Sequence, residues 1–456
     1  MSSRLSRALA HRLEPALYYG WVIVGVVLLS NLVTFSVSVT FGLYITPLER
    51  EFGWSRSAIA VGYALGPVAG ALTAPLLGML VDRVGVRLLM PAGGLLGGMA
   101  FLLLSRIDAL WQFYLLYAVI FVTMYAGVGQ LIGATSVTRW FVRRRGRALG
   151  IIMMGASGGG MIFIPIQNLL IETLGWRQAF ALYGLIAMAL ICLPGLLLMA
   201  NAPEQLGQEG NPELTLPRAA GSASQGEDSW TLAQAVRTRV FWTVLAGVMM
   251  ATVCVSGYFT HVVPFLESVG FTRTQASSAW SFFFFIGMIA KFLWGFVTER
   301  IPVRVCLGVC MLGEMVGLFL LMHARSTADL VVYAIVNGLL HGPFLQLLAL
   351  VWGNYFGRKS IGTILGVTQP ATVLAAALGP LLGGLLFDRF GNYQAFLWVL
   401  FGMAAGAGCM FLVSPPPVRA VRADASGAEP VPAAVGSAGH GAAARGQAAP
   451  AGAQPE

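Results

Sequence analysis

The sequence predicts an all-α membrane protein with twelve transmembrane helices in two pseudo-symmetric six-helix bundles. Three observations predict it: a shortage of charge, twelve long apolar runs and an internal repeat. Of the 456 residues, 57% are hydrophobic and only 10% are charged, whereas a soluble protein carries about 25% charged residues. Because so few charges cannot cover a water-exposed surface, most of the outer surface is expected to face lipid.

Each transmembrane helix needs about 20 consecutive apolar residues to cross the hydrocarbon layer. The chain contains twelve such runs: 18–45, 57–81, 86–105, 110–137, 147–171, 178–200, 240–265, 275–298, 303–323, 328–353, 361–387 and 393–414. The first run is too long for the apolar core of a cleaved signal peptide. The expected organisation is an N-tail (1–17), a first bundle (18–200), a linker (201–239), a second bundle (240–414) and a disordered C-tail (415–456).

The distribution of basic residues predicts the orientation. If the N-terminus is cytoplasmic, the cytoplasmic segments hold 20 of the 28 Lys and Arg residues and the external loops hold seven. Cytoplasmic loops are enriched in basic residues, so both termini are expected to be cytoplasmic in a multi-pass inner-membrane protein. The basic residues are spread over short loops and form no continuous basic stripe, which argues against nucleic-acid binding.

The two bundles resemble each other in sequence. At an offset of 217, Pro47, Gly53, Arg56, Gly78, Asp82, Arg83 and Arg87 correspond to Pro264, Gly270, Arg273, Gly295, Glu299, Arg300 and Arg304. At an offset of 216, Gly150 corresponds to Gly366, and 175–180 corresponds to 391–396. Such duplication is typical of carriers in which two matched halves rock about a central site.

Part of this repeat predicts a gate at the cytoplasmic ends of helices two and eight. The candidate gating residues are Asp82, Arg83 and Arg87 in the first half and Glu299, Arg300 and Arg304 in the second. Each acid could pair with loop arginines or a helix N-terminus while the inner mouth is closed. The alternative is that these residues only anchor the helix ends at the cytoplasmic surface.

These features together resemble the major facilitator superfamily, and specifically its monocarboxylate-porter branch, which includes oxalate/formate-type carriers. The resemblance covers almost all of 18–414 and is carried by 20–24, 47–48, 51–56, 78–87, 140–141, 144–148 and 261–266. It implies the major facilitator fold and a cargo such as lactate, pyruvate or oxalate, often carried with a proton.

Two positions in helix eight depart from the family pattern. Where the family usually has an Arg that contacts the substrate carboxylate, this chain has Lys291. Some members place an Asp one turn earlier as a proton-coupling partner, and here that residue is Gly287. The positive charge is kept, but the bidentate fork of Arg is lost, and proton coupling through the family's pair is not expected.

Lys291 is the main candidate for substrate binding. It lies eight residues before Glu299, so it is about 12 Å inside the membrane at ~1.5 Å per helical residue. An unpaired ammonium there costs about 3 kcal/mol on insertion scales, which favours an anion contact in a cavity over snorkelling to the interface. Lys291 is also a candidate proton site, because burial favours the neutral amine.

Other polar residues within the apolar runs are secondary candidates. Glu314 and His261 could take part in proton coupling, and His261 could also contact substrate, but each could instead be satisfied by hydrogen bonds to neighbouring helices. Further substrate-binding candidates are Asn31, Tyr125, Gln130, Asn337 and Gln346, in helices one, four and ten. The same alternative, hydrogen bonding between helices, applies to each of them.

No enzyme, metal site or organic cofactor is expected. Ser, His and Asp residues or paired carboxylates form no recognisable catalytic pattern, and the five cysteines lie in apolar runs without metal-ligand spacing. The sequence is therefore interpreted as a monomeric secondary transporter of a small organic acid. The proton is the expected coupling ion, and the proton gradient would drive transport. Alternatives are an organic-anion exchanger, a non-transporting membrane sensor of the same fold, and a drug or cation exporter.

Overall fold

The computed structural model describes residues 18–141, 144–206, 230–298, 300–356 and 361–417. Within these residues the regular structure is entirely helical. The helices are α2 (Gly20–Val39), α3 (Gly42–Phe52), α4 (Arg56–Val84), α5 (Val86–Leu104), α6 (Leu110–Ile120), the π-helix η1 (Phe121–Ile132), α7 (Gly133–Trp140), α8 (Arg145–Leu174), α9 (Trp176–Leu198), the 3-10 turn η2 (Pro203–Leu206), α10 (Leu232–Ala235), α11 (Arg239–Ser268), α12 (Arg273–Thr298), α13 (Val303–His323), α14 (Thr327–His341), α15 (Phe344–Phe356), α16 (Ile361–Phe390) and α17 (Gln394–Leu412).

Most of the expected membrane runs are confirmed as long apolar helices. Eleven helical segments within the described residues are long and apolar enough to cross a membrane. For nine of the twelve expected runs, the observed ends lie within three residues of the expected ones. The first, fourth and tenth runs differ, and each difference has a local cause.

The first run was expected to continue to residue 45, but α2 ends at Val39 and a separate helix, α3, follows. The hydroxyl of Ser36 donates to the carbonyl of Val33, and that of Thr40 donates to the carbonyl of Ser36. Such bonds compete with the helical ladder and bend helices. The expectation of one helix over 18–45 was therefore wrong.

The fourth run, 110–137, is helical but not one α-helix, because it changes to η1 at Phe121. Gly127 and Gly129 lie within η1, and glycine weakens the α-helical preference of a segment. The tenth run divides into α14 and α15 at Gly342–Pro343. Pro343 has no backbone N–H and its ring clashes with the preceding turn, so it cannot continue α14. A single α-helix was the wrong expectation for both runs.

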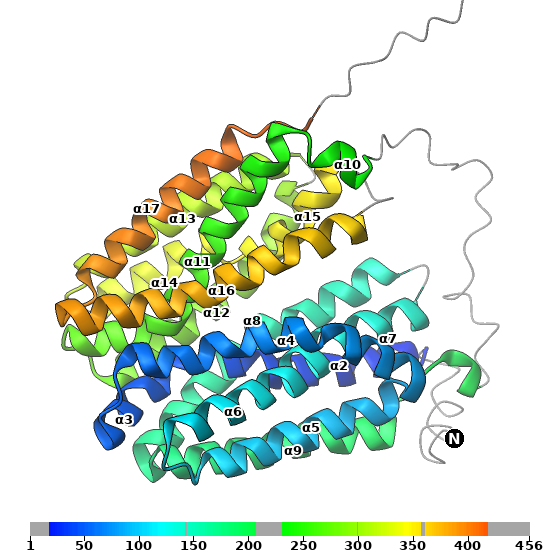
Figure 1. Cartoon of the computed structure of the whole chain (residues 1–456), viewed down its shortest axis with the longest axis horizontal. Coiled ribbons are helices and arrows are strands. Elements are labelled where there is room, and N and C mark those ends of the chain that lie inside the picture. The colour runs from blue at the N-terminus through cyan, green and yellow to red at the C-terminus, as the bar shows by residue number, and fades with distance from the viewer. Residues whose placement is uncertain (1–17, 142–143, 207–229, 299, 357–360, 418–456) are drawn as a thin grey trace, which may run out of the picture. The chain divides into compact units, whose positions relative to one another are not determined.

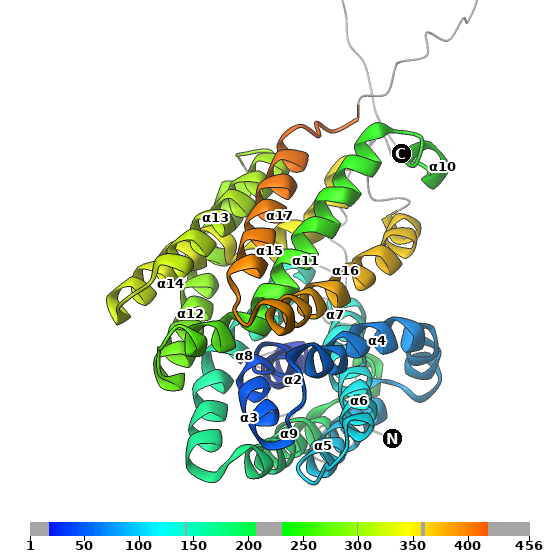
Figure 2. The same cartoon turned by 60° about the vertical axis from the view of Figure 1, so that its left-hand side comes forward.

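The first half (α2 to α9) and the second half (α11 to α17) belong to one compact unit that ends at Pro417. Figure 1 shows the two halves as separate groups of helices, and Figure 2 shows α4 beside α16 where the groups meet. The halves pack mainly through α4 against α16 and α8 against α12, with smaller contacts of α11 with α2 and α3. The four long helices α4, α8, α12 and α16 therefore form most of the interface between the halves.

The repeat predicted from sequence is confirmed in the backbone. The turn before α4 and the turn before α12 carry Gly53 and Gly270, with φ of 64° and 101°. The turns before α9 and α17 carry Gly175 and Gly391, with φ of 84° and 69°. Left-handed φ values favour glycine, so matched glycines mark the same chain reversal in both halves.

Candidate functional site between the two halves

A small cavity lies between the halves, bordered by α2, α8, α11, α12, α14 and α15. Its polar lining includes Ser157, Lys291 and His341, and its apolar lining includes Phe35 and Phe284. The cavity volume is about 20 Å³, which is enough for about one water molecule. The space beside these side chains is therefore nearly filled in this conformation.

Lys291 lies on α12 and borders this cavity. Its Nζ donates a hydrogen bond to Oγ of Ser157 on α8, across the interface between the halves. The hydroxyl is neutral and leaves the ammonium without a direct anionic contact from the described residues, a position that suits an anion. The sequence predicted Lys291 as a cavity residue, but Ser157 was missed because it carries no signal within a glycine-rich run.

A fully buried acid lies behind the cavity wall. Glu314 on α13 has no exposed surface, and its Oε2 is 3.3 Å from Nδ1 of His341 on α14. His341 itself borders the cavity. Asn337, one turn earlier on α14, is also buried, and its Nδ2 donates to the hydroxyl of Tyr258 at 3.3 Å. Asn337 thus bonds between helices α14 and α11.

The remaining substrate-binding candidates lie on three different helices, α2, α15 and η1. Asn31 is half-buried and donates to the carbonyl of Ile152 at 3.3 Å, joining α2 to α8. Gln346 is half-buried on α15. Tyr125 and Gln130 lie in η1 and their side chains are outside the described part of the structure. Their roles as substrate ligands stay predictions.

His261 on α11 belongs to a buried hydrogen-bond chain rather than to the cavity lining. Its Nε2 lies 2.8 Å from the carbonyl of Pro380, so Nε2 carries the proton and donates. Nδ1 then accepts from the hydroxyl of Tyr393 at 3.1 Å. The Tyr393 hydroxyl in turn accepts from Nη1 of Arg56 at 2.8 Å. His261 thereby supports a contact between the halves.

Arg56 is the centre of that contact, at the end of the molecule formed by the α3–α4 and α16–α17 turns. Its Nε donates to Glu49 at 2.9 Å. Its guanidinium lies 3.7 Å from the ring centre of Phe387 on α16. An Arg held by a carboxylate, a hydroxyl and an aromatic face is fixed in position. We call this end of the molecule the Arg56 end.

Two acids bridge the halves at the Arg56 end in a symmetric way. Asp388 on α16 accepts from the backbone N–H groups of Arg56 and Ser57, at 3.1 Å and 3.0 Å, at the N-terminus of α4. Glu172 on α8 accepts from the hydroxyl of Thr274 at 2.8 Å, in the first turn of α12. In the repeat, Glu172 corresponds to Asp388. Each half therefore supplies an acid to the start of a helix in the other half.

A third matched feature reinforces this closure. Arg273 donates to Glu267 at 2.7 Å, and the other oxygen of Glu267 accepts from Thr46 of the first half at 2.5 Å. Arg56 and Arg273 correspond in the repeat, and both hold an acid from the preceding turn. The Arg56 end is thus closed by contacts that the sequence analysis missed, because they join residues hundreds of positions apart.

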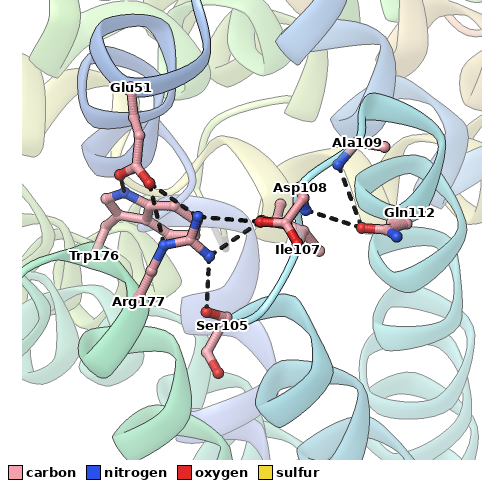
Figure 3. A network of polar contacts seen from close by, with 8 residues as sticks. All are labelled: Glu51, Ser105, Ile107, Asp108, Ala109, Gln112, Trp176 and Arg177. Atoms are coloured by element: carbon pink, nitrogen blue, oxygen red, sulfur yellow. Dashed lines mark hydrogen bonds and ion pairs between the residues drawn. The ribbon is translucent and has the colours of Figure 1, made fainter.

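The first half is also braced internally at this end (Figure 3). Trp176 and Arg177, which begin α9, both donate to Glu51 near the end of α3. Arg177 also donates to the carbonyls of Ser105 and Ile107 in the α5–α6 turn. The Trp176 hydrogen bond, followed by the Arg177 contacts, lowers the pKa of Glu51 although burial opposes this shift. This network joins the end of α3, the α5–α6 turn and the start of α9 to one another.

At the opposite end the predicted gating residues are only partly described. The side chain of Asp82, and Glu299 altogether, lie outside the described residues. Arg83 and Arg300 are exposed, and Arg87 and Arg304 are half-buried. The backbone N–H of Arg87 donates to Asn201 at 2.9 Å. Their gating role stays a prediction.

Comparison with known proteins identifies relatives over nearly the whole chain. The model of the Major Facilitator Superfamily matches residues 26–290 and 262–442. Monocarboxylate transporter 12-B of Danio rerio is 25% identical over 88% of this chain and 88% of its own length. Monocarboxylate transporter 13 of Rattus norvegicus is 23% identical over 90% and 92%.

Other comparisons agree with this fold. The uncharacterized MFS-type transporter YhjX of Escherichia coli is 29% identical over 48% of this chain and 51% of its own length. The crystal structure of the nucleoside transporter NupG superposes with a TM-score of 0.67 at 14% identity, covering 87% of this chain and 99% of that one. An inward-facing bacterial homolog of the lysosomal transporter Spinster gives a TM-score of 0.62 at 16% identity, over 87% and 94%.

Proposed function

Because this chain belongs to the major facilitator superfamily and resembles its monocarboxylate-transporter branch, we propose that it carries small monocarboxylate-like organic anions across the membrane by alternating access. It is a multi-pass membrane protein, and its relatives are named as transporters. The expectation that it is not an enzyme is thereby confirmed. The cargo, its coupling ion, the inner-membrane location and the cytoplasmic placement of both termini are parts of the proposal.

The position of Lys291 is the observation that carries the proposed cargo. Its ammonium borders the cavity between the halves and has a neutral hydroxyl as its hydrogen-bond acceptor. A substrate carboxylate would displace Ser157 and bring a negative charge into direct contact with the ammonium. A charge-assisted hydrogen bond of this kind contributes about 1.5–3 kcal/mol. A cationic cargo, as expected for a cation exporter, would meet a like charge at the same place.

The closed contacts at the Arg56 end support alternating access. If the termini are cytoplasmic, the Arg56 end is the external side, and this conformation is the one closed to the outside. Substrate would therefore enter or leave from the cytoplasmic side in this state, and opening the Arg56 end would complete the cycle.

We favour proton symport, with exchange of organic anions as the second candidate. Exchange is favoured by Gly287, which stands where some relatives of this family have a proton-coupling Asp. The protein would work as a monomer, without an organic cofactor, with the organic acid and the lipid bilayer as its partners. A sensor of the same fold would bind the anion without flux.

Uptake into proteoliposomes tests the proposal. Labelled lactate, pyruvate and oxalate would be offered with and without an imposed pH gradient. Lys291→Ala should weaken binding by about 10- to 150-fold, from the loss of about 1.5–3 kcal/mol, whereas Lys291→Arg should retain much of it. Lys359→Ala, at the only other lysine in the sequence, is the matched control. Normal uptake by Lys291→Ala would refute the proposed anion site.

A further inference from the structure

Glu314 and His341 form a buried acid–base pair, and the side chain of Asn337 lies beside the acid. Both side chains are at most 2% exposed, and Oε2 of Glu314 is 3.3 Å from Nδ1 of His341. Neither carboxylate oxygen accepts a well-directed hydrogen bond from the residues that the structure describes. The His341 ring stacks on Phe344, with ring centres 5.2 Å apart. This packing fixes the imidazole beside the acid.

Such a pair has two forms that differ by one proton. In the deprotonated form, Glu314 is a carboxylate beside a neutral His341, with Oε2 and Nδ1 3.3 Å apart, and the pair has a charge of −1. In the protonated form, the added proton is on either partner and the pair is neutral overall. An ionised carboxylate is costly in a low-dielectric interior unless a positive charge balances it. The charge facing the pair therefore decides which form is stable.

Lys291 is the charged group that faces the pair from the neighbouring helices. It borders the same cavity as His341, and α12 packs against α14. The other titratable groups in this region are Cys254 and Tyr258 of α11, Cys310 of α13 and Tyr333 of α14, all buried. The sequences of α15 and α17, which pack against α13, contain no Asp, Glu, Lys, Arg or His.

We propose that the Glu314–His341 pair is the proton-binding site that couples proton movement to an organic anion bound at Lys291. This inference rests on the proposed function and deepens it, because it assigns the coupling site. It also explains how coupling can survive with Gly287 in helix α12. The acid comes from α13 and the base from α14, instead of both charges coming from one helix.

Charge balance provides the coupling. In the empty carrier, Lys291 at +1 balances the deprotonated pair at −1. When an anion binds Lys291, neutrality is restored only if the pair takes up one proton. A carrier with anion but no proton, or proton but no anion, has one unbalanced charge inside the membrane, which is costly. Only the empty and the doubly loaded forms cross readily, and anion and proton each strengthen the binding of the other.

Proton uptake on ligand binding tests this directly. Purified protein in weakly buffered detergent solution, with a pH indicator dye, would be titrated with lactate, pyruvate and oxalate. The wild type should take up about one proton per bound anion. Glu314→Gln should bind the anion without proton uptake. In proteoliposomes this variant should keep exchange of labelled anion at equal concentrations but lose accumulation driven by a pH gradient.

Lys291→Arg separates the pair from the other candidate proton site, because Arg does not lose its proton in proteins. It should keep proton uptake if the pair is the site. Loss of uptake in Lys291→Arg, or unchanged uptake in Glu314→Gln, would overturn the inference. Absence of anion binding in the wild type would instead refute the proposed function itself.

Thermal unfolding would reveal whether Glu314→Gln fails to fold. In that case His341→Gln provides a second test. This variant keeps the carboxyl and removes the base, so the pH midpoint of proton uptake should shift. An unchanged midpoint would equally overturn the inference.

Discussion

Gly384 on α16 is where the closed Arg56 end is most sensitive to added volume. A Cβ at this position would lie 2.5 Å from Cα of Ser57 and 2.8 Å from the carbonyl carbon of Arg56. Both atoms belong to the backbone of the other half, at the start of α4, so neither can rotate away as a flexible side chain does. Gly384→Ala should therefore force the halves apart at this end.

The size of the effect follows from the tight packing. An extra methyl group in a well-packed interface costs about 1–3 kcal/mol. The proposed cycle separates α4 from α16 at this end in its other state, so only the closed state is destabilised. The population should shift about 5- to 150-fold toward the state that is open at the Arg56 end.

Spin labels at Arg106→Cys and Arg325→Cys would measure this shift by pulsed electron paramagnetic resonance, with the native cysteines replaced. These exposed residues lie in the α5–α6 and α13–α14 turns, one in each half. Gly384→Ala should enlarge the long-distance population. Gly402→Ala on α17, where an added Cβ meets nothing within 4 Å, should not. An unchanged distance distribution in Gly384→Ala would refute the reasoning.

Two further predictions concern acids at the same end. Asp388→Asn removes the charge that faces the first N–H groups of α4, which is worth about 0.3–1 kcal/mol, so the same labels should report a smaller shift in the same direction. Asp329→Asn alters a helix cap within the second half, so it should lower thermal stability without changing the distance between the labels. Equal changes of this distance in the two variants would refute the role of Asp388 in closing the Arg56 end. Hydrogen bonds from Trp176 and then Arg177 lower the pKa of Glu51, so its stabilisation is present at neutral pH and lost as the pH falls below its ordinary value of 4.5. The difference in thermal midpoint between wild type and Glu51→Gln should narrow on acidification, and a constant difference would show that the charge of Glu51 contributes nothing.

The sequence predicts the helices well because the bilayer constrains them. Length and apolar composition locate nine of the twelve runs to within three residues, and matched glycines locate equivalent turns in the two halves. The departures are at Thr40, Phe121 and Pro343, where local hydrogen bonding, glycines and the proline ring, respectively, account for the interruption of the α-helix. Hydropathy does not register such interruptions, although Gly342–Pro343 is a recognisable breaker in the sequence.

The site was less accessible to sequence reasoning, because its contacts join distant helices. Lys291 was identifiable as an unusual charge within an apolar run, but its contact with Ser157 spans 134 residues. The pairing of Glu314 with His341 depends on how α13 packs against α14, which periodicity does not reveal. Asp388 and Glu172 were not predicted, although they correspond in the repeat.

In the proposed mechanism, the residues of the gate are repeated in both halves, whereas the residues that bind the cargo are not. Arg56 and Arg273 correspond in the two halves, as do Glu172 and Asp388. Arg56, Glu172 and Asp388 bond across the halves at the Arg56 end, and Arg273 holds Glu267, which bonds across them. The proposed binding site has no such symmetry, since at the offset of 217 Lys291 corresponds to Ala74. The proposed gate closes on both halves, and the residues that close it are matched between them. A single anion needs only one cation, so its charge can come from one half, and the proton needed to balance it can come from the same half.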